Sequence, residues 1–132
     1  MIAPSPPRPT AVRVARPCSS LTAAAGFYVD LVGLPELSRF ADHDGFSGLI
    51  VGLPGDAHQL EFLSGPGGHP NPTPTPEDLL VLYLPVGEHE AIVRRLRSAG
   101  QLPVSPLNPY WTKIEALHFV DPDNYGLVLV PG

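Results

Sequence analysis

Apolar residues recur with two different periods along this chain, and the two periods alternate. From Ala11 to Pro17, Val12 and Val14 alternate with other residues, which is the period-two pattern of a β-strand that ends at a proline. Between Leu21 and Val32 the apolar positions recur every three or four residues, which predicts an amphipathic helix with Gly33 as its left-handed stop. Three more strands are predicted, over residues 37–41, 46–53 and 58–63. The first half of the chain therefore reads β-α-β-β-β.

The same order of elements restarts in the second half. The strand predicted over residues 80–85 matches residues 12–17, with proline over proline, and residues 88–99 form the second predicted helix, with Gly100 as its stop. A short strand near residues 101–104, an irregular segment over 105–111 and a hairpin over 114–130 complete the unit. Residues 58–63 correspond to residues 125–130, so Glu61 occupies the register position of Val128. These correspondences predict an internal repeat of about half the chain.

Two proline-rich segments divide the chain. Residues 1–10 contain four prolines, which remove backbone donors and favour a disordered tail. Residues 65–77 contain five prolines and read as a stiff, polar linker. We therefore predict a tail over residues 1–10, a first module over 11–64, the linker over 65–77 and a second module over 78–132. The two modules are expected to form one domain over residues 11–131.

Composition and charge exclude several classes of function. The chain has 132 residues, enough to bury the core of one domain, and a net charge of −5 without a run of Lys or Arg, which argues against nucleic acid as a partner. No apolar stretch approaches the roughly 20 residues that cross a bilayer, and no secretory apolar block precedes the first strand, so we expect a cytoplasmic protein without a membrane partner. The single cysteine, Cys18, excludes an intrachain disulfide, and we expect an inert thiol.

The chain contains four short motifs, namely Phe27-Tyr28, Leu31-Val32-Gly33-Leu34, Leu60-Glu61-Phe62 and Asp121-Pro122-Asp123-Asn124-Tyr125. In this order and spacing they resemble the vicinal oxygen chelate superfamily. That superfamily includes glyoxalase I, the bleomycin and fosfomycin resistance proteins and the extradiol dioxygenases. The resemblance covers residues 11–130 and implies an α+β fold. In this fold two βαβββ modules form paired curved mixed sheets around a concave pocket, with the helices outside and dimerisation often completing the pocket.

The resemblance also implies four positions for metal ligands, on the first and last strands of the two modules. Matched by register, these positions hold Arg13, Glu61, Val81 and Val128. A divalent ion needs several oxygen or nitrogen donors, and neither valine nor a guanidinium has a lone pair to give. We therefore expect no divalent metal and no other cofactor.

Arg13 and Glu61 leave two interpretations open. A bidentate pair between them would satisfy both charges as a structural ion pair on the floor of the sheet. Alternatively, Arg13 receives an anionic or carbonyl-bearing ligand, and Glu61 orients it or acts as a general base.

Six further residues are candidates for binding a ligand. Tyr110 and Trp111 lie in an irregular segment, and each provides a wide apolar ring with one polar group that can form a hydrogen bond. Alternatively, Trp111 could equally plug the open end of the sheet. His118 shares a strand face with apolar residues and is either a core or a pocket histidine. Strand alternation places the remaining candidates toward the same concavity. These are Phe46, Gln59 and Tyr83.

We carry three hypotheses for the function. The first is a metal-independent protein, similar to glyoxalases and bleomycin resistance proteins, that binds a small hydrophobic or anionic molecule in a pocket associated with a homodimer. The second is an enzyme of the same superfamily, a lyase, isomerase, epimerase or dioxygenase acting on a small metabolite, with Glu61 as base or metal ligand. The third is a conventional metal-dependent lyase or dioxygenase, which the donor set opposes.

Overall fold

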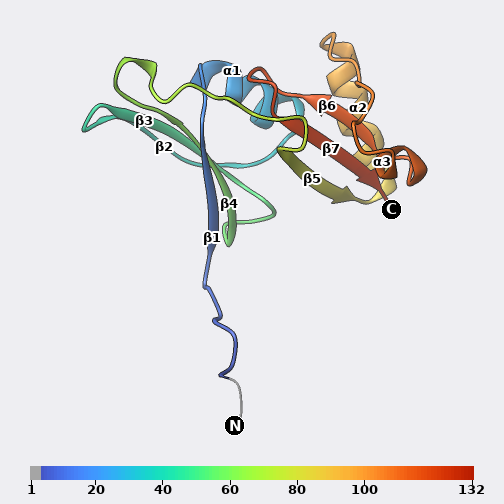
Figure 1. Ribbon diagram of the computed structural model, residues 1–132, viewed down its shortest axis with the longest axis horizontal. Helices are drawn as coiled ribbons and strands as arrows, with labels where there is room; N and C mark the ends of the chain where they lie inside the picture. The colour runs from blue at the N-terminus through green and yellow to red at the C-terminus, as the bar shows by residue number, and fades with distance from the viewer. Residues whose placement is uncertain (1–3) are drawn as a thin grey trace.

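Two mixed β-sheets, one from each half of the chain, carry the fold (Figure 1). The computed structural model describes residues 4–132, so the first three residues of the predicted tail lie outside the described range. Residues 4–10 form no helix or strand and extend away from the body of the molecule (Figure 1). The predicted α+β class with two mixed sheets is confirmed.

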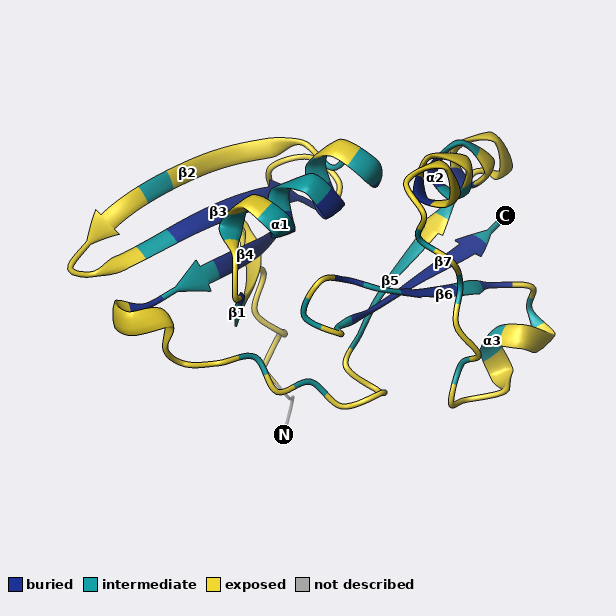
Figure 2. Cartoon of the chain, turned by 90° about the horizontal axis from the view of Figure 1, so that it is seen from above, coloured by how far each residue is buried: buried dark blue, intermediate teal, exposed yellow. Residues whose placement is uncertain are grey.

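The first sheet has four strands in the order β1-β4-β3-β2. Strand β1 (Val12–Pro17) pairs in parallel with β4 (His58–Ser64), which pairs antiparallel with β3 (Phe46–Gly52). Strand β2 (Glu36–His43) closes the sheet on the other side of β3 and is largely exposed (Figure 2). The predicted strands are thus present, with β2 longer at both ends than the pattern indicated.

The second sheet has three strands in the order β5-β7-β6. Strand β5 (Leu79–Leu84) pairs in parallel with β7 (Gly126–Pro131), which pairs antiparallel with β6 (Leu117–Val120). The strand expected near residues 101–104 is wrong as a full strand, because only an isolated bridge between Val104 and His118 forms. Pro103 and Pro106 lack the N–H groups that would extend a ladder on either side of that bridge.

The two main helices lie against the sheets on one side of the molecule (Figure 1). Helix α1 (Leu21–Ala25), capped by Ser20, continues as the π-helix η1 (Gly26–Leu31), so the second half of the predicted helix is wider than expected. Helix α2 spans Val86–Ser98 and begins two residues before its predicted start. The segment expected to be irregular contains the short helix α3 (Tyr110–Lys113), and a 3-10 turn, η2 (Pro66–Gly68), lies in the linker. None of the helices within residues 4–132 is long and apolar enough to span a bilayer.

A single hydrophobic core joins the two modules. The helices contribute Tyr28 and Leu96, and the sheets contribute alternate residues such as Phe62, Phe119 and Leu127, all at most 1% exposed. Figure 2 shows this buried material along β3, β4 and β7. We call the sheet face that packs in this core the inner face and the opposite one the outer face.

A buried carboxylate links the second module to the first. Asp121 accepts hydrogen bonds from the backbone N–H groups of Asp123 (2.8 Å) and Tyr125 (3.0 Å), which fix the turn before β7. Its other oxygen, Oδ2, accepts from the hydroxyl of Tyr28 (2.7 Å) and lies 3.4 Å from the guanidinium of Arg16, which also bonds to Tyr28. Burial raises the pKa of Tyr28 above its usual value, so the hydroxyl stays protonated and donates. The Arg16 guanidinium stacks 4.2 Å from the centre of the Tyr125 ring.

We expect Asp121→Ala to lower the free energy of unfolding by about 3–5 kcal/mol, because it leaves the Arg16 guanidinium buried without its carboxylate. Urea denaturation measures this change. The matched control is Glu36→Ala, which removes the exposed ion pair with Arg39 and should cost about 0–1 kcal/mol. Equal losses in the two variants would contradict a stabilising role for the buried cluster.

Candidate functional site

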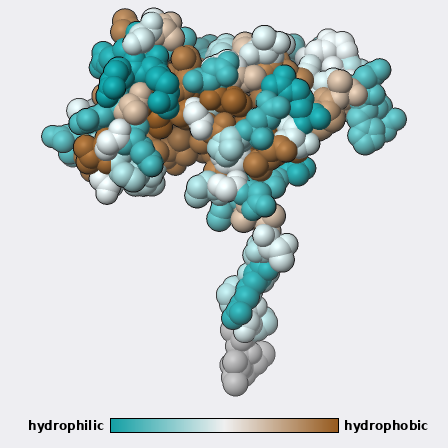
Figure 3. Space-filling model, turned by 180° about the vertical axis from the view of Figure 1, so that it is seen from behind, coloured by the Kyte–Doolittle hydropathy of each residue, from teal (hydrophilic) through white to brown (hydrophobic). Residues whose placement is uncertain are grey.

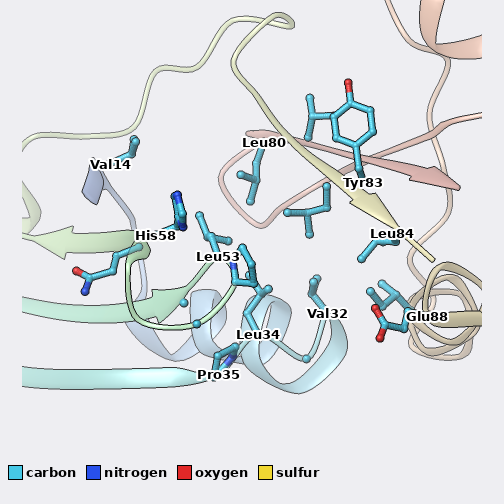
Figure 4. A pocket seen from close by; sticks show the side chains of 18 of the residues that line it. Val14, Val32, Leu34, Pro35, Leu53, His58, Leu80, Tyr83, Leu84 and Glu88 are labelled. Atoms are coloured by element: carbon cyan, nitrogen blue, oxygen red, sulfur yellow. The ribbon is translucent and has the colours of Figure 1, made fainter. Parts of the chain in front are cut away.

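A groove with a volume of about 830 Å³ separates the free edges of the two sheets. We call it the inter-module groove. Figure 4 shows that its walls come from both modules: from β1, the start of β4 and the loops that follow η1 and β3 on one side, and from β5 and α2 on the other. The wall is mostly apolar and includes Val14, Leu34, Leu53, Leu80, Leu82 and Tyr83. Seen from behind, hydrophobic residues gather across the middle of the molecule (Figure 3).

The two strands that border this groove are each paired on one side only. Within residues 4–132, β1 pairs with β4 and β5 pairs with β7, and no ladder joins β1 to β5. Val12 is 46% exposed, Val14 58% and Tyr83 70%. Free edges that present apolar side chains are ready to pair with another strand, and soluble proteins usually cover or charge them.

Arg13, Gln59 and Glu61 share the outer face of the first sheet, but they do not interact as one interpretation of the sequence required. The parallel register sets Arg13 beside Gln59, and Arg13 Nε donates to Gln59 Oε1 over 2.8 Å. Glu61 lies opposite Ala15 and Ile50 instead. It is only 8% exposed, and no hydrogen bond or ion pair reaches its carboxylate from the described residues. The expected Arg13–Glu61 ion pair is therefore wrong.

A small hydrophobic cluster covers the outer face of the second sheet. Val81 and Val128 are direct register partners there, and Trp111 from α3 packs against them together with Ile114. Trp111 thus packs on a face of the second sheet and lines neither the inter-module groove nor the open end of the sheet. Its Nε1 is buried without a hydrogen-bond partner among residues 4–132, and its ring lies 5.2 Å from that of Tyr110.

Comparison with known proteins assigns the chain to a family. Residues 12–63 match the model of the YycE-like N-terminal domain, and residues 77–131 match that of the YycE-like C-terminal domain. The uncharacterised protein YycE of Bacillus subtilis is 35% identical over 120 residues, which cover 90% of this chain and 86% of that protein. The chain therefore belongs to the YycE-like family.

Solved structures agree with this assignment. The crystal structure of a YycE protein from Bacillus subtilis, of unknown function and described as a candidate glyoxalase/fosfomycin resistance protein, has a TM-score of 0.85 at 34% identity, covering 92% of this chain and 89% of that one. The fosfomycin resistance protein FosX of Listeria monocytogenes, complexed with Mn(II) and sulfate, has a TM-score of 0.67 at 12% identity, covering 92% and 90%. This YycE-like chain thus has the vicinal oxygen chelate fold, as its resemblance predicted.

The residues at the superfamily's metal positions in this YycE-like chain do not fit a metal. Val81 and Val128 are part of the hydrophobic cluster under Trp111, and the Arg13 guanidinium is bonded to Gln59. Glu61 alone offers a lone pair, whereas a protein site for a divalent ion uses several donors. Among residues 4–132 no group of three or more His, Cys, Asp or Glu side chains could hold an ion.

The structure places the predicted ligand-binding residues in different parts of the molecule. Gln59 and Tyr83 line the inter-module groove. His118 is 6% exposed and lines a second hollow, on the other side of the C-terminal module, where burial lowers its pKa. Phe46 and Tyr110 are 40% and 51% exposed and line neither cavity.

Several groove residues escaped the sequence analysis. Leu34 lies in a loop, where no periodicity marks a wall residue, and Leu53, predicted as the last residue of a strand, lies just after the end of β3. Arg95 lines the groove from α2 and donates to the backbone oxygens of Leu31 (2.7 Å) and Val32 (3.2 Å), so it ties α2 to the end of η1. Its spacing within the second helix gave no signal of this contact.

Cys18 is buried at the end of β1 and offers no nucleophile to the groove. Burial raises the pKa of its thiol to about 11, and the nearby carboxylates of Asp123 and Asp121 act in the same direction. The thiol is therefore protonated at neutral pH.

We expect the folded protein to react with a thiol-specific reagent at pH 8 at least about tenfold more slowly than the protein unfolded in urea, because burial reduces both access and thiolate content. Cys18 is the only cysteine, so the absorbance change reports this site alone. The pKa is 9.0 for the unfolded thiol and about 11 in the fold, so this thiol should also cost stability as pH rises from about 9 to 11. Equal reaction rates would show that the thiol is accessible.

Proposed function

We propose that this YycE-like protein binds a small hydrophobic or anionic molecule in the inter-module groove, without a metal. The observation that carries the proposal is the apolar groove of about 830 Å³, a size typical of small-molecule pockets. The apolar walls hold the body of the ligand. Gln59 lies in the wall, and Arg13, which does not itself line the groove but is bonded to Gln59, provides a positive charge beside it for an anionic group.

The proposed metal independence rests on the chemistry of the replaced ligands. Restoring a metal site would require donors where Val81 and Val128 now lie, and these side chains pack beneath Trp111 with 0% exposure for Val128. Binding energy must then come from apolar burial and from hydrogen bonds, as in most small-molecule pockets.

We further propose that a second copy of the chain closes the groove. Both edges that border the groove, β1 and β5, are free to pair, and both expose apolar side chains. A copy that pairs with these edges would extend each sheet and cover the open side of the groove. Helices α1 and α2 lie against the inner faces of the sheets, so the outer faces of an extended sheet would together form one continuous surface. On that surface, Glu61 and Arg13 of one chain would lie on the same side as Tyr83 of the other.

An enzymatic function is the second candidate, and one observation favours it. Glu61 is a mostly buried residue whose carboxylate has no protein partner in the described range and is not among the fully buried side-chain atoms, so a ligand can reach it; partly buried carboxylates of this kind occur where acid–base chemistry is done. Once a ligand is found, Glu61→Gln separates the two candidates. A binder keeps its affinity, whereas an enzyme keeps its binding but loses turnover by about a hundredfold or more.

The proposed binding can be tested with anilinonaphthalene sulfonate, a probe that is both hydrophobic and anionic. We expect its fluorescence to rise on binding to the folded protein, with the same Kd before and after dialysis against EDTA. Tyr83→Ala should weaken binding by more than about 1 kcal/mol, because it removes an aromatic wall of the groove.

The control is Leu102→Ala, which truncates another exposed apolar residue, 66% exposed and outside the groove, and should leave the Kd unchanged. A near-stoichiometric metal that Glu61→Ala removes would overturn metal independence. Equal effects of the two alanine variants would place the probe elsewhere on the surface.

The proposed dimer predicts a mass in solution of about twice the 14.1 kDa of the chain, measured by sedimentation equilibrium. Val14→Lys should return the mass to that of one chain, because a lysine on the free edge of β1 opposes pairing. Leu102→Lys places the same charge on an exposed apolar position away from both edges and should leave the dimer intact. A wild-type protein of 14.1 kDa would reject the dimer.

A further inference from the structure

A second hollow lies beside the edge strand of the C-terminal sheet. Its volume is about 560 Å³, and its walls come from β6, from the 104–107 segment and from the linker around Pro74 to Pro76. It shares no lining residue with the inter-module groove. Its size is within the range of about 300–1,000 Å³ typical of small-molecule pockets.

The hollow occupies the place where the second module lacks a strand. The 104–107 segment meets β6 once, where Val104 N donates to His118 O over 2.7 Å, and then diverges at Pro106. Because backbone groups alternate along an antiparallel strand, the N–H and C=O of Val120 point to the same open edge as His118 O. Gly126, opposite Val120, donates to Asp78 on the other side of its strand. The edge of β6 therefore offers the hollow one peptide donor and one peptide acceptor.

His118 adds a buried polar side chain to this wall. The residue is 6% exposed, and its Nδ1 is buried without a partner among residues 4–132. Its Nε2 lies above Gly126, where a Cβ would come within 2.7 Å of it. Burial lowers the pKa of the imidazole more than the carboxylate of Glu77 raises it, so the ring is neutral at pH 7 and can accept as well as donate a hydrogen bond.

The charges around the hollow favour an uncharged ligand. No lysine or arginine lines it, and the nearby carboxylate of Glu77 disfavours an anion. The remaining wall is largely proline, valine and leucine, which suits an apolar body. A primary carboxamide presents an acceptor oxygen and two N–H donors, which complement the N–H and C=O of the Val120 peptide and the unpartnered Nδ1 of the imidazole. We propose that this hollow is a second ligand site, for a neutral apolar carboxamide held by His118 and the backbone of Val120.

Benzamide and benzoate form a matched pair of probes for this site, because they differ only in the amide and the carboxylate. In titrations of ¹⁵N-labelled protein, benzamide should shift the amide signals of His118, Val120 and Gly126 and leave that of Tyr83 in place. Benzoate should bind at least about tenfold more weakly. His118→Phe should weaken benzamide about tenfold through the loss of one hydrogen bond, whereas His43→Phe, the same change at an exposed histidine, should not.

Unchanged signals of β6, equal affinities for the two probes, or an unaltered affinity in His118→Phe would each overturn the proposal. If His118→Phe does not fold, Ser105→Trp fills the hollow from its exposed rim and should abolish the shifts. Because the two cavities share no residue, this result is independent of the anilinonaphthalene sulfonate test of the groove.

Discussion

The arrangement of the two modules depends on the buried carboxylate of Asp121. One of its oxygens fixes the turn that leads into β7, and the other accepts from Tyr28 in the first module and faces the guanidinium of Arg16. A carboxylate that is 4% exposed requires such partners, since an unpaired buried charge is strongly destabilising. The cluster therefore couples the geometry of a turn in one module to the end of a strand in the other.

This coupling has a consequence for the edges of the sheets. The modules share one core through their inner faces and helices, so β1 and β5 do not pair with each other within residues 4–132. Their apolar edge residues remain exposed, and the space between them is the inter-module groove. The groove and the free edges are thus two results of one packing arrangement, which is why binding and self-association are proposed together.

The sequence predicted the elements well because their periods are strong. Residues 12–17, with Val12 and Val14 alternating before a proline, form β1 as expected. Arg16 occupies the next position after Val12 and Val14 on the inner face, where an apolar residue is expected. A cation at such a position is a signal that an acid lies nearby to pair with it. The partner of Arg13 was not predictable, because parallel pairing can slide along a strand and only the folded register sets Gln59 rather than Glu61 beside it. The groove wall at Leu34 lies in a loop without hydrophobic periodicity, and the strand pattern that included Leu53 gave no sign that this residue would line a groove.

Pro103 and Pro106 were a sequence signal against the strand expected near residues 101–104, since they lack the N–H donors that would extend its ladder. The outcome is that the two halves, similar in order, differ at one edge: β2 completes the first sheet, whereas a hollow lies beside β6 in the second.

Glu61 is a mostly buried acid that has no protein partner in the described range. Asp121 is bonded to Tyr28 and to two backbone N–H groups and faces the guanidinium of Arg16, whereas Glu61, beside Ile50 and Ala15, has no partner in the described range. A valine at the corresponding position of the second module, Val128, is fully buried and shows that an apolar side chain is compatible with this register. Packing alone therefore gives no reason for an acid at position 61. The Glu61 carboxylate has no protein partner in the described range and is not fully buried, so it is available for a contact supplied from outside the chain, either a ligand or a second copy.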